Sequence, residues 1–300
     1  MTRSLASAAL AALSLLAACG PAGSGSLGSA PTATPRPTVT SSTASPSTTP
    51  SPTKRGTTNP RSPAGTAPTA GAPSGRTIMF EIWLVRDGTL FVTRRTRPTT
   101  VATARLALTT LIAGPTATEA NAGVSSPIAS GTTFDVALNN GVATVDLPAS
   151  FYDGGDALAR LRQAQVVYTL TQYPTITKVG FQKDGEATGW PLGRGDYADF
   201  LPPIVVASPI IGQRVDSPVT VSGTADVFEA TVSVRIRDAS GAEIATTFTT
   251  ATCGSGCRGR YSVAVRYQVS GVQRGTVEVF SVSAKDGSDQ HLVRIPVTLS

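Results

Sequence analysis

The sequence of 300 residues predicts an α+β sheet-and-helix domain followed by an all-β sandwich, with the N-terminal third disordered. Three observations lead to this prediction. Residues 20–76 are mostly Pro, Ser, Thr, Gly and Ala, residues 77–202 mix strand-like alternation with helical spacing, and residues 203–300 show alternation alone. Because helical periodicity ends near residue 202, we place a domain boundary there. The expected division is a signal peptide at 1–18, a tether at 19–76, and domains at 77–202 and 203–300.

The N-terminus has the features of an export signal that ends at a cysteine. The uncharged apolar run after Arg3 is too short to span a bilayer as a stable helix, so it is predicted to be a cleaved signal peptide. Ala17 and Ala18 directly precede Cys19, and this run resembles the bacterial lipobox. The resemblance implies that Cys19 carries diacylglycerol and palmitate and anchors the chain in membrane lipid, on the extracytoplasmic face of the cell membrane. The alternative is an ordinary secretory signal with an incidental cysteine.

The segment 19–76 is predicted to be a disordered tether. It has no aromatic residue and few large apolar ones, so burial cannot offset the entropy of ordering it. Of the 25 basic residues, six lie in residues 1–76, where there is no acidic residue, so 19 basic and 19 acidic residues remain for the two domains. Nucleic acid is therefore excluded as a partner, because its binding needs a basic folded face. Contact with anionic lipid or wall polymer stays open.

The first domain is predicted to open with a hairpin and a helix. Residues 78–85 are rich in Ile, Phe and Trp, and an Asp-Gly turn leads into a second strand at residues 90–93. Apolar residues then recur at helical spacing over residues 99–113. Gly114 and the proline after it predict the end of that helix.

The rest of the first domain is predicted to add a capped turn, a hairpin, a helix and a strand. Thr116 and Glu119 have the spacing of a capping box, which gives Glu119 a structural role. An Asn-Gly turn predicts a hairpin over residues 134–147, and a helix at 156–173 precedes a strand at 176–182. The expected arrangement is one sheet with two helices on one face.

Several runs of this domain are familiar as a set. They are Ala-Leu-Thr-Thr-Leu-Ile-Ala-Gly-Pro-Thr at 107–116, Ser-Pro-Ile at 126–128 with Gly-Thr at 131–132, Gly-Val-Ala-Thr-Val-Asp-Leu at 141–147, Gln-Val-Val-Tyr-Thr-Leu-Thr-Gln at 165–172 and Val-Gly-Phe at 179–181. Together they resemble the germination-type lipoprotein domain of sporulation and spore-germination proteins. The resemblance identifies caps, turns and core positions, and it supplies no catalytic residue.

The second domain is predicted to be a sandwich of about seven strands. Apolar and polar residues alternate at 219–221, 232–236, 261–267 and 293–299, and turn residues separate these runs. The runs at 208–209, 215–219, 221–225, 227–231 and 279–281 resemble the immunoglobulin-like domain of bacterial spore germination. The resemblance implies an extracellular interaction module whose exposed turns bind a partner.

Two cysteines of the second domain are predicted to form a disulfide. Cys253 and Cys257 enclose a short loop with two glycines, and an exported domain meets an oxidising environment. A zinc site would need further ligands, and His291 is the only histidine of the chain. We therefore predict no metal and no cofactor, and we interpret His291 as a residue at a strand edge.

Three functions remain open at this point. The first is a non-catalytic binding or assembly module of the bacterial cell envelope, whose partner is an unknown envelope protein or a wall polymer. The second is a wall-polymer-binding protein that contacts the polyanion through Arg94, Arg95 and Arg97. A role in spore germination would rest only on an analogy of fold.

The third function is a glycan hydrolase. Its paired carboxylates would come from Asp146, Asp153 and Asp156, which lie close together in the sequence. Simpler interpretations make Asp156 the N-cap of the second long helix and Asp153 a turn residue. We therefore expect no enzymatic activity.

Overall fold

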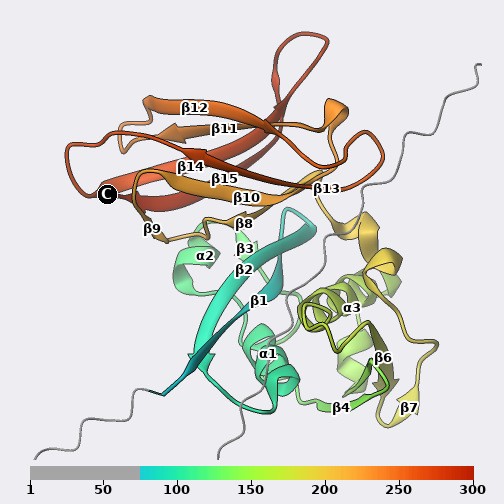
Figure 1. Cartoon of the computed structure of the whole chain (residues 1–300). Coiled ribbons are helices and arrows are strands. Elements are labelled where there is room, and N and C mark those ends of the chain that lie inside the picture. Colours follow the sequence, from blue (N-terminus) through green and yellow to red (C-terminus); the bar gives the residue numbers. More distant parts are fainter. Residues whose placement is uncertain (1–74) are drawn as a thin grey trace, which may run out of the picture. The chain divides into compact units, whose positions relative to one another are not determined.

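The protein is described by a computed structural model over residues 75–300 (Figure 1). The predicted signal peptide, Cys19 and nearly all of the predicted tether lie outside the described residues. Among the helices of residues 75–300, none is both long enough and apolar enough to cross a membrane. The described residues belong to one compact unit with a mixed α/β first part and a β second part, which confirms the predicted fold class.

The first domain opens with a long hairpin. Strands β1 (Thr77–Arg86) and β2 (Thr89–Pro98) pair in antiparallel register along their whole length, so both are longer than predicted. Asp87 and Gly88 have positive φ values of 52° and 76°, as a tight two-residue hairpin turn requires. The short strand β3 (Val124–Ser125) pairs with the other edge of β1 and completes a three-stranded sheet.

A second sheet lies on the far side of the helices. It has the order β4-β5-β6-β7, with β4 (Asp135–Asn139), β5 (Val142–Leu147), β6 (Lys178–Lys183) and β7 (Glu186–Ala187). Strands β5 and β6 are parallel, because helix α3 provides the crossover that a parallel pair needs.

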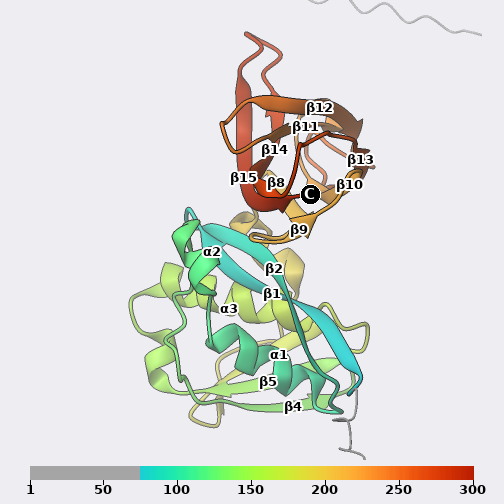
Figure 2. The same ribbon diagram turned by 90° about the vertical axis from the view of Figure 1, so that its left-hand side faces the viewer.

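Two helices of the first domain, α1 (Thr103–Ile112) and α3 (Asp156–Leu170), form the middle layer (Figure 2). The short helix α2 (Ala117–Asn121) lies beside β3, outside this layer. Figure 2 shows α1 and α3 between the β1–β2 hairpin and the β4–β5 hairpin. The prediction of one sheet with helices on one face was therefore wrong. Alternation shows which face of a strand is buried, but strand pairing depends on contacts between distant residues.

The second domain is a sandwich of two sheets. One has the order β13-β10-β8 and the other the order β12-β11-β14-β15-β9. The bounds are β8 (Ile204–Ser208), β9 (Arg214–Val215), β10 (Val219–Ala225), β11 (Thr231–Arg237), β12 (Glu243–Thr250), β13 (Gly259–Val265), β14 (Gln273–Val282) and β15 (Asp289–Leu299). Val232, Val234 and Ile236 are fully buried between the sheets, whereas the residues between them face outward.

Candidate functional site

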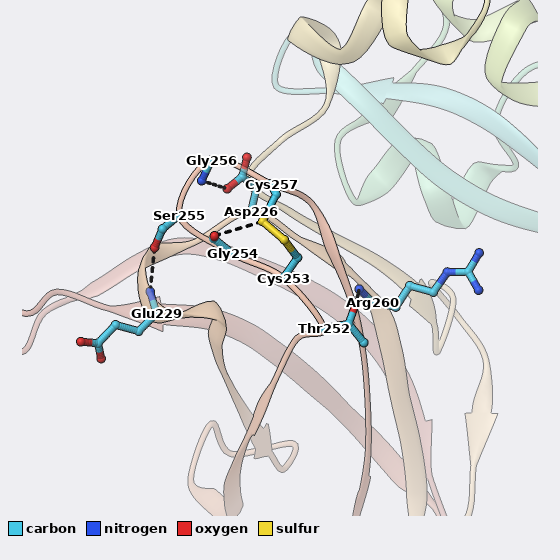
Figure 3. Close-up of a disulfide and its surroundings, with 9 residues drawn as sticks. All are labelled: Asp226, Glu229, Thr252, Cys253, Gly254, Ser255, Gly256, Cys257 and Arg260. Carbon is cyan, nitrogen blue, oxygen red and sulfur yellow. Dashed lines mark hydrogen bonds between the residues drawn. A yellow bond between two sulfur atoms is a disulfide. The ribbon is translucent and has the colours of Figure 1, made fainter. Parts of the chain in front are cut away.

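A disulfide closes the loop between β12 and β13 (Figure 3). It joins Cys253 and Cys257, whose Cα atoms are 5.7 Å apart. The ring rests on the turn that precedes β11. The backbone N–H of Gly256 donates to a carboxylate oxygen of Asp226 at 2.9 Å. The hydroxyl of Ser255 accepts from the backbone N–H of Glu229 at 3.1 Å. Two hydrogen bonds therefore join the disulfide ring to the turn before β11.

The contact between the ring and the turn leaves no room for a side chain. A Cβ atom added at Gly254 would lie 2.6 Å from the Cα atom of Ala230 and from the carbonyl oxygen of Val227. Glu229 and Ser255, one from each loop, have φ values of 54° and 57°, which non-glycine residues adopt only when the surroundings hold them there. The pair of loops is thus a rigid feature of the sandwich end.

One large apolar side chain is displayed by this rigid pair of loops. Phe228, in the short 3-10 turn Phe228–Ala230, exposes 62% of its surface. Its backbone neighbours are fixed by the disulfide ring, so this aromatic side chain is presented without the entropy loss of ordering a loop. An exposed aromatic residue on a fixed turn suits a binding surface better than it suits catalysis.

Two arginines follow the ring, Arg258 directly and Arg260 after one glycine. Arg258 donates from Nη2 to the carbonyl oxygen of Pro202 at 2.7 Å, and burial lowers the pKa of its guanidinium. Arg260 is anchored through its backbone N–H, which donates to the hydroxyl of Thr252 at 2.9 Å, and its side chain is exposed. Figure 3 shows the Arg260 side chain extending away from the ring. The disulfide loop is thus followed by one arginine whose guanidinium is held and one that is anchored by its backbone alone.

The three arginines predicted to contact a polyanion do not form one patch. Arg95 lies in a buried ion pair with Glu119, with Nη2 and Oε2 2.5 Å apart and side-chain exposures of 9% and 3%. Arg94, the preceding residue of β2, faces the opposite side of the strand, across from Glu81 in β1. Arg97 is exposed near the strand end. Arg95 is therefore not available to a polyanion, because a carboxylate already binds it.

The ion pair of Arg95 is joined to the predicted capping box. The hydroxyl of Thr116 accepts from the backbone N–H of Glu119, and the Glu119 carboxylate accepts from the backbone N–H of Thr116, so the box is confirmed. Burial raises the pKa of Glu119, but hydrogen bonds from Arg95 and Thr93 outweigh it and hold the pKa below its usual range. The structural role predicted for Glu119 is present, with a partner that the sequence did not indicate.

The three carboxylates of the hydrolase hypothesis lie in strand β5, after a short 3-10 turn and at the start of α3. Asp146 accepts a hydrogen bond from the backbone N–H of Gly185 at 2.9 Å, and Asp153 follows a short 3-10 turn. Asp156 is the first residue of α3, and its predecessor Gly155 is the N-cap, so the assignment of Asp156 as N-cap was wrong by one residue. Gly155 has φ 90°, a value that glycine adopts readily.

His291 lies in β15 near the strand start, and its side chain is exposed. Within residues 75–300, no group of three or more His, Cys, Asp and Glu side chains is placed to hold a metal ion.

A second buried carboxylate was not foreseen. Glu278 on β14 is paired with Arg235 at 2.7 Å, Arg237 at 3.0 Å and Arg294 at 3.1 Å, on the outer face of the five-stranded sheet. Burial raises the pKa of Glu278, but the hydrogen bonds with Arg235 and Arg237 lower it by more, so the pKa lies below its usual value. Alternation could have placed each residue on this face, but only the strand register brings them together.

Comparison with known proteins gives two family matches. The family described as sporulation and spore germination matches residues 83–189. The family described as the immunoglobulin-like domain of bacterial spore germination matches residues 203–288. Both matches agree with the resemblances noted from the sequence. No curated protein matches the chain.

Solved structures with some similarity include three from two bacterial proteins. The first GerMN domain of the sporulation protein GerM from Bacillus subtilis is 24% identical, with a TM-score of 0.32, over 39% of this chain and 95% of that one. The tandem GerMN domains of the same protein are 15% identical, with a TM-score of 0.35, over 75% and 61% of the two chains. A suspected lipoprotein from Clostridium perfringens is 14% identical, with a TM-score of 0.29, over 42% and 93%. With scores this low, these similarities add nothing to the two family matches.

Proposed function

Because the chain carries a sporulation and spore germination domain followed by an immunoglobulin-like domain of bacterial spore germination, we propose that it is a membrane-anchored lipoprotein on the extracytoplasmic side of the bacterial cell membrane. Its folded part serves as a non-catalytic binding or assembly module of the cell envelope. Acylated Cys19 provides the anchor, and the two domains provide the surface for a partner.

The disulfide between Cys253 and Cys257 is the observation that carries this proposal. Disulfides persist in oxidising compartments outside the cytoplasm and are rare in reducing ones. A loop held in this way is compatible with a domain that acts beyond the membrane. The same loop holds Phe228 exposed on a rigid turn, as a binding surface requires.

The absence of turnover is part of the proposal. Asp146 and Asp156 serve a turn and a helix start, and Glu119 and Glu278 are each neutralised by arginines. The arginines hold the pKa of Glu119 and of Glu278 below the usual value, whereas an acid catalyst needs a pKa raised towards the working pH. The chain is thus better suited to binding than to general acid catalysis.

Changing Cys19→Ser tests the anchor. Cells that produce the full-length chain are separated into membrane, soluble and medium fractions, and the protein is followed by immunoblot. We expect the unmodified chain in the membrane fraction and Cys19→Ser in the soluble fraction or medium, because the hydroxyl cannot take the place of the thiol that accepts the lipid.

The matched control is the double variant Cys253→Ser, Cys257→Ser, which removes the other two cysteines and should stay in the membrane fraction. Thiol counting under denaturing, non-reducing conditions should give no free thiol for the Cys253–Cys257 pair of the exported protein. If Cys19→Ser remained with the membrane as firmly as the unmodified chain, the anchored function would be wrong.

A further inference from the structure

A large open cleft lies within the compact unit formed by the described residues, with a volume of about 1010 Å³. Residues of both domains line it, and Trp83 and Tyr168 come from the first domain. Their rings are stacked at a tilt, with centroids 4.8 Å apart. A smaller hollow of about 510 Å³ shares Glu81, Arg194 and Arg260 with the cleft and extends it along β1 to Arg94 of β2. Together they form one elongated surface.

Four arginines line this surface. They are Arg94, Arg194, Arg258 and Arg260. Glu81 is the one acidic residue among the described residues that line it. The folded part as a whole has equal numbers of basic and acidic residues, so this excess of positive charge is local. None of the four arginines forms an ion pair within residues 75–300.

Arg194 is held in place like a preformed ligand-binding group. Its Nε donates to the hydroxyl of Thr171 at 2.8 Å, and its Nη2 donates to the carbonyl oxygen of Tyr168 at 2.9 Å. The guanidinium carbon lies 5.0 Å from the centre of the Tyr168 ring. Burial lowers the pKa of this guanidinium, the nearby charge of Glu81 offsets part of that effect, and within residues 75–300 its hydrogen bonds are to neutral groups. A partly desolvated cation with no carboxylate in hydrogen-bond contact is unfavourable, and a bound anion would relieve that penalty.

Hydroxyl side chains make up much of the remaining wall. They are Ser222, Thr224, Thr249, Thr250, Thr252 and Ser262. A hydroxyl both donates and accepts hydrogen bonds, so such a wall matches a ligand that is itself rich in hydroxyl groups. The cleft therefore presents separated cations beside neutral hydroxyl groups. Its open shape can admit a polymer chain, and it does not enclose a small molecule.

We propose that this arginine cleft binds an anionic glycan, a sugar polymer that carries carboxylate or phosphate groups. The guanidinium groups bind the acidic groups, and the hydroxyl wall binds the sugar hydroxyls. The site goes beyond the envelope role proposed above, because it names a ligand class, and it does not depend on the lipid anchor. It replaces the sequence-based assignment of the polyanion contact to residues 94–97 with four arginines from three distant segments.

Binding of fluorescently labelled glycans to the full-length chain in detergent, followed by anisotropy, tests this proposal. Polygalacturonate supplies carboxylates, phosphomannan supplies phosphates, and neutral dextran is the uncharged control. We expect one or both anionic glycans to bind and dextran not to bind. Arg94→Ser and Arg260→Ser should each weaken binding about tenfold, the loss of one charge-assisted contact.

Arg97→Ser is the matched control, because it removes the same charge from the same strand as Arg94→Ser but lies outside the cleft. It should leave affinity within about twofold of the unmodified chain, since a distant exposed charge is screened by salt. Thermal unfolding of each variant is measured to check that it remains folded. Equal weakening by Arg97→Ser, no binding of either anionic glycan, or tighter binding of single-stranded DNA would each overturn the assignment. The failure of Cys19→Ser to leave the membrane would not affect it.

Discussion

At the scale of single residues, the pair Arg95 and Glu119 shows what a sequence can and cannot predict. The three-residue spacing of Thr116 and Glu119 was enough to predict the capping box, because the box is local. The arginine partner lies on β2, 24 residues earlier, so no local pattern could indicate it. Alternation along a strand did separate Arg94 from Arg95, and treating residues 94–97 as one patch overlooked that signal.

Replacing Glu119 should reveal this buried pair. Glu119→Gln keeps the shape but removes the charge that Arg95 needs, and we expect the free energy of unfolding at about pH 7 to fall by about 3 kcal/mol. Because the fold lowers the pKa of Glu119, its contribution is present above the ordinary value of 4.5 and is lost as the pH falls through the folded value. The deficit of the variant should therefore shrink in acid.

Urea unfolding across the range from about pH 7 to about pH 3 measures this difference. The control is Glu186→Gln, which makes the same change on the exposed strand β7 and should alter stability little at any pH. A deficit that stayed constant with pH would show that ionisation of Glu119 does not stabilise the fold.

At the scale of elements, turns were predicted best and sheet pairing worst. The Asn-Gly turn was predicted correctly, and Asn140 and Gly141 have positive φ values of 47° and 79°. Helix α1 begins at Thr103 and not at residue 99, and its N-cap Ala102 has no capping side chain to mark the start. The second sheet of the first domain was missed, because pairing β1 with β3 and β5 with β6 depends on distant segments.

The disulfide ring and the turn before β11 pack so closely that Gly254 should tolerate no side chain. Gly254→Ala places a Cβ atom 2.6 Å from the backbone of Ala230, so one loop must shift. We expect a loss of about 2 kcal/mol in the free energy of unfolding, the usual effect of overpacking. The control is Gly271→Ala, whose Cβ atom would meet nothing within 4 Å. Denaturant unfolding of the two variants checks this, and equal stability would show that the loops are not tightly packed.

At the scale of the whole molecule, the fold class followed from composition and periodicity, and the division into domains at residue 202 stays a prediction. The arginine cleft did not, because its four arginines come from three segments that are far apart in the sequence, and each looks like an ordinary surface cation there. Even charge counting pointed away from such a site, since the folded part balances to zero. A local excess of one sign can be found only when the fold has brought the charges together.

The hydrogen bond from Arg258 to Pro202 should affect where a protease can cleave the chain. Its guanidinium binds the backbone directly before β8, so the junction of the two domains is not a free hinge that a protease can enter. Limited digestion with thermolysin should leave one resistant fragment that contains both domains. Arg258→Met should yield two fragments instead, and an unchanged pattern would contradict this role. If the chain is anchored as proposed, a cut upstream of residue 75 would then release residues 75–300 in one piece.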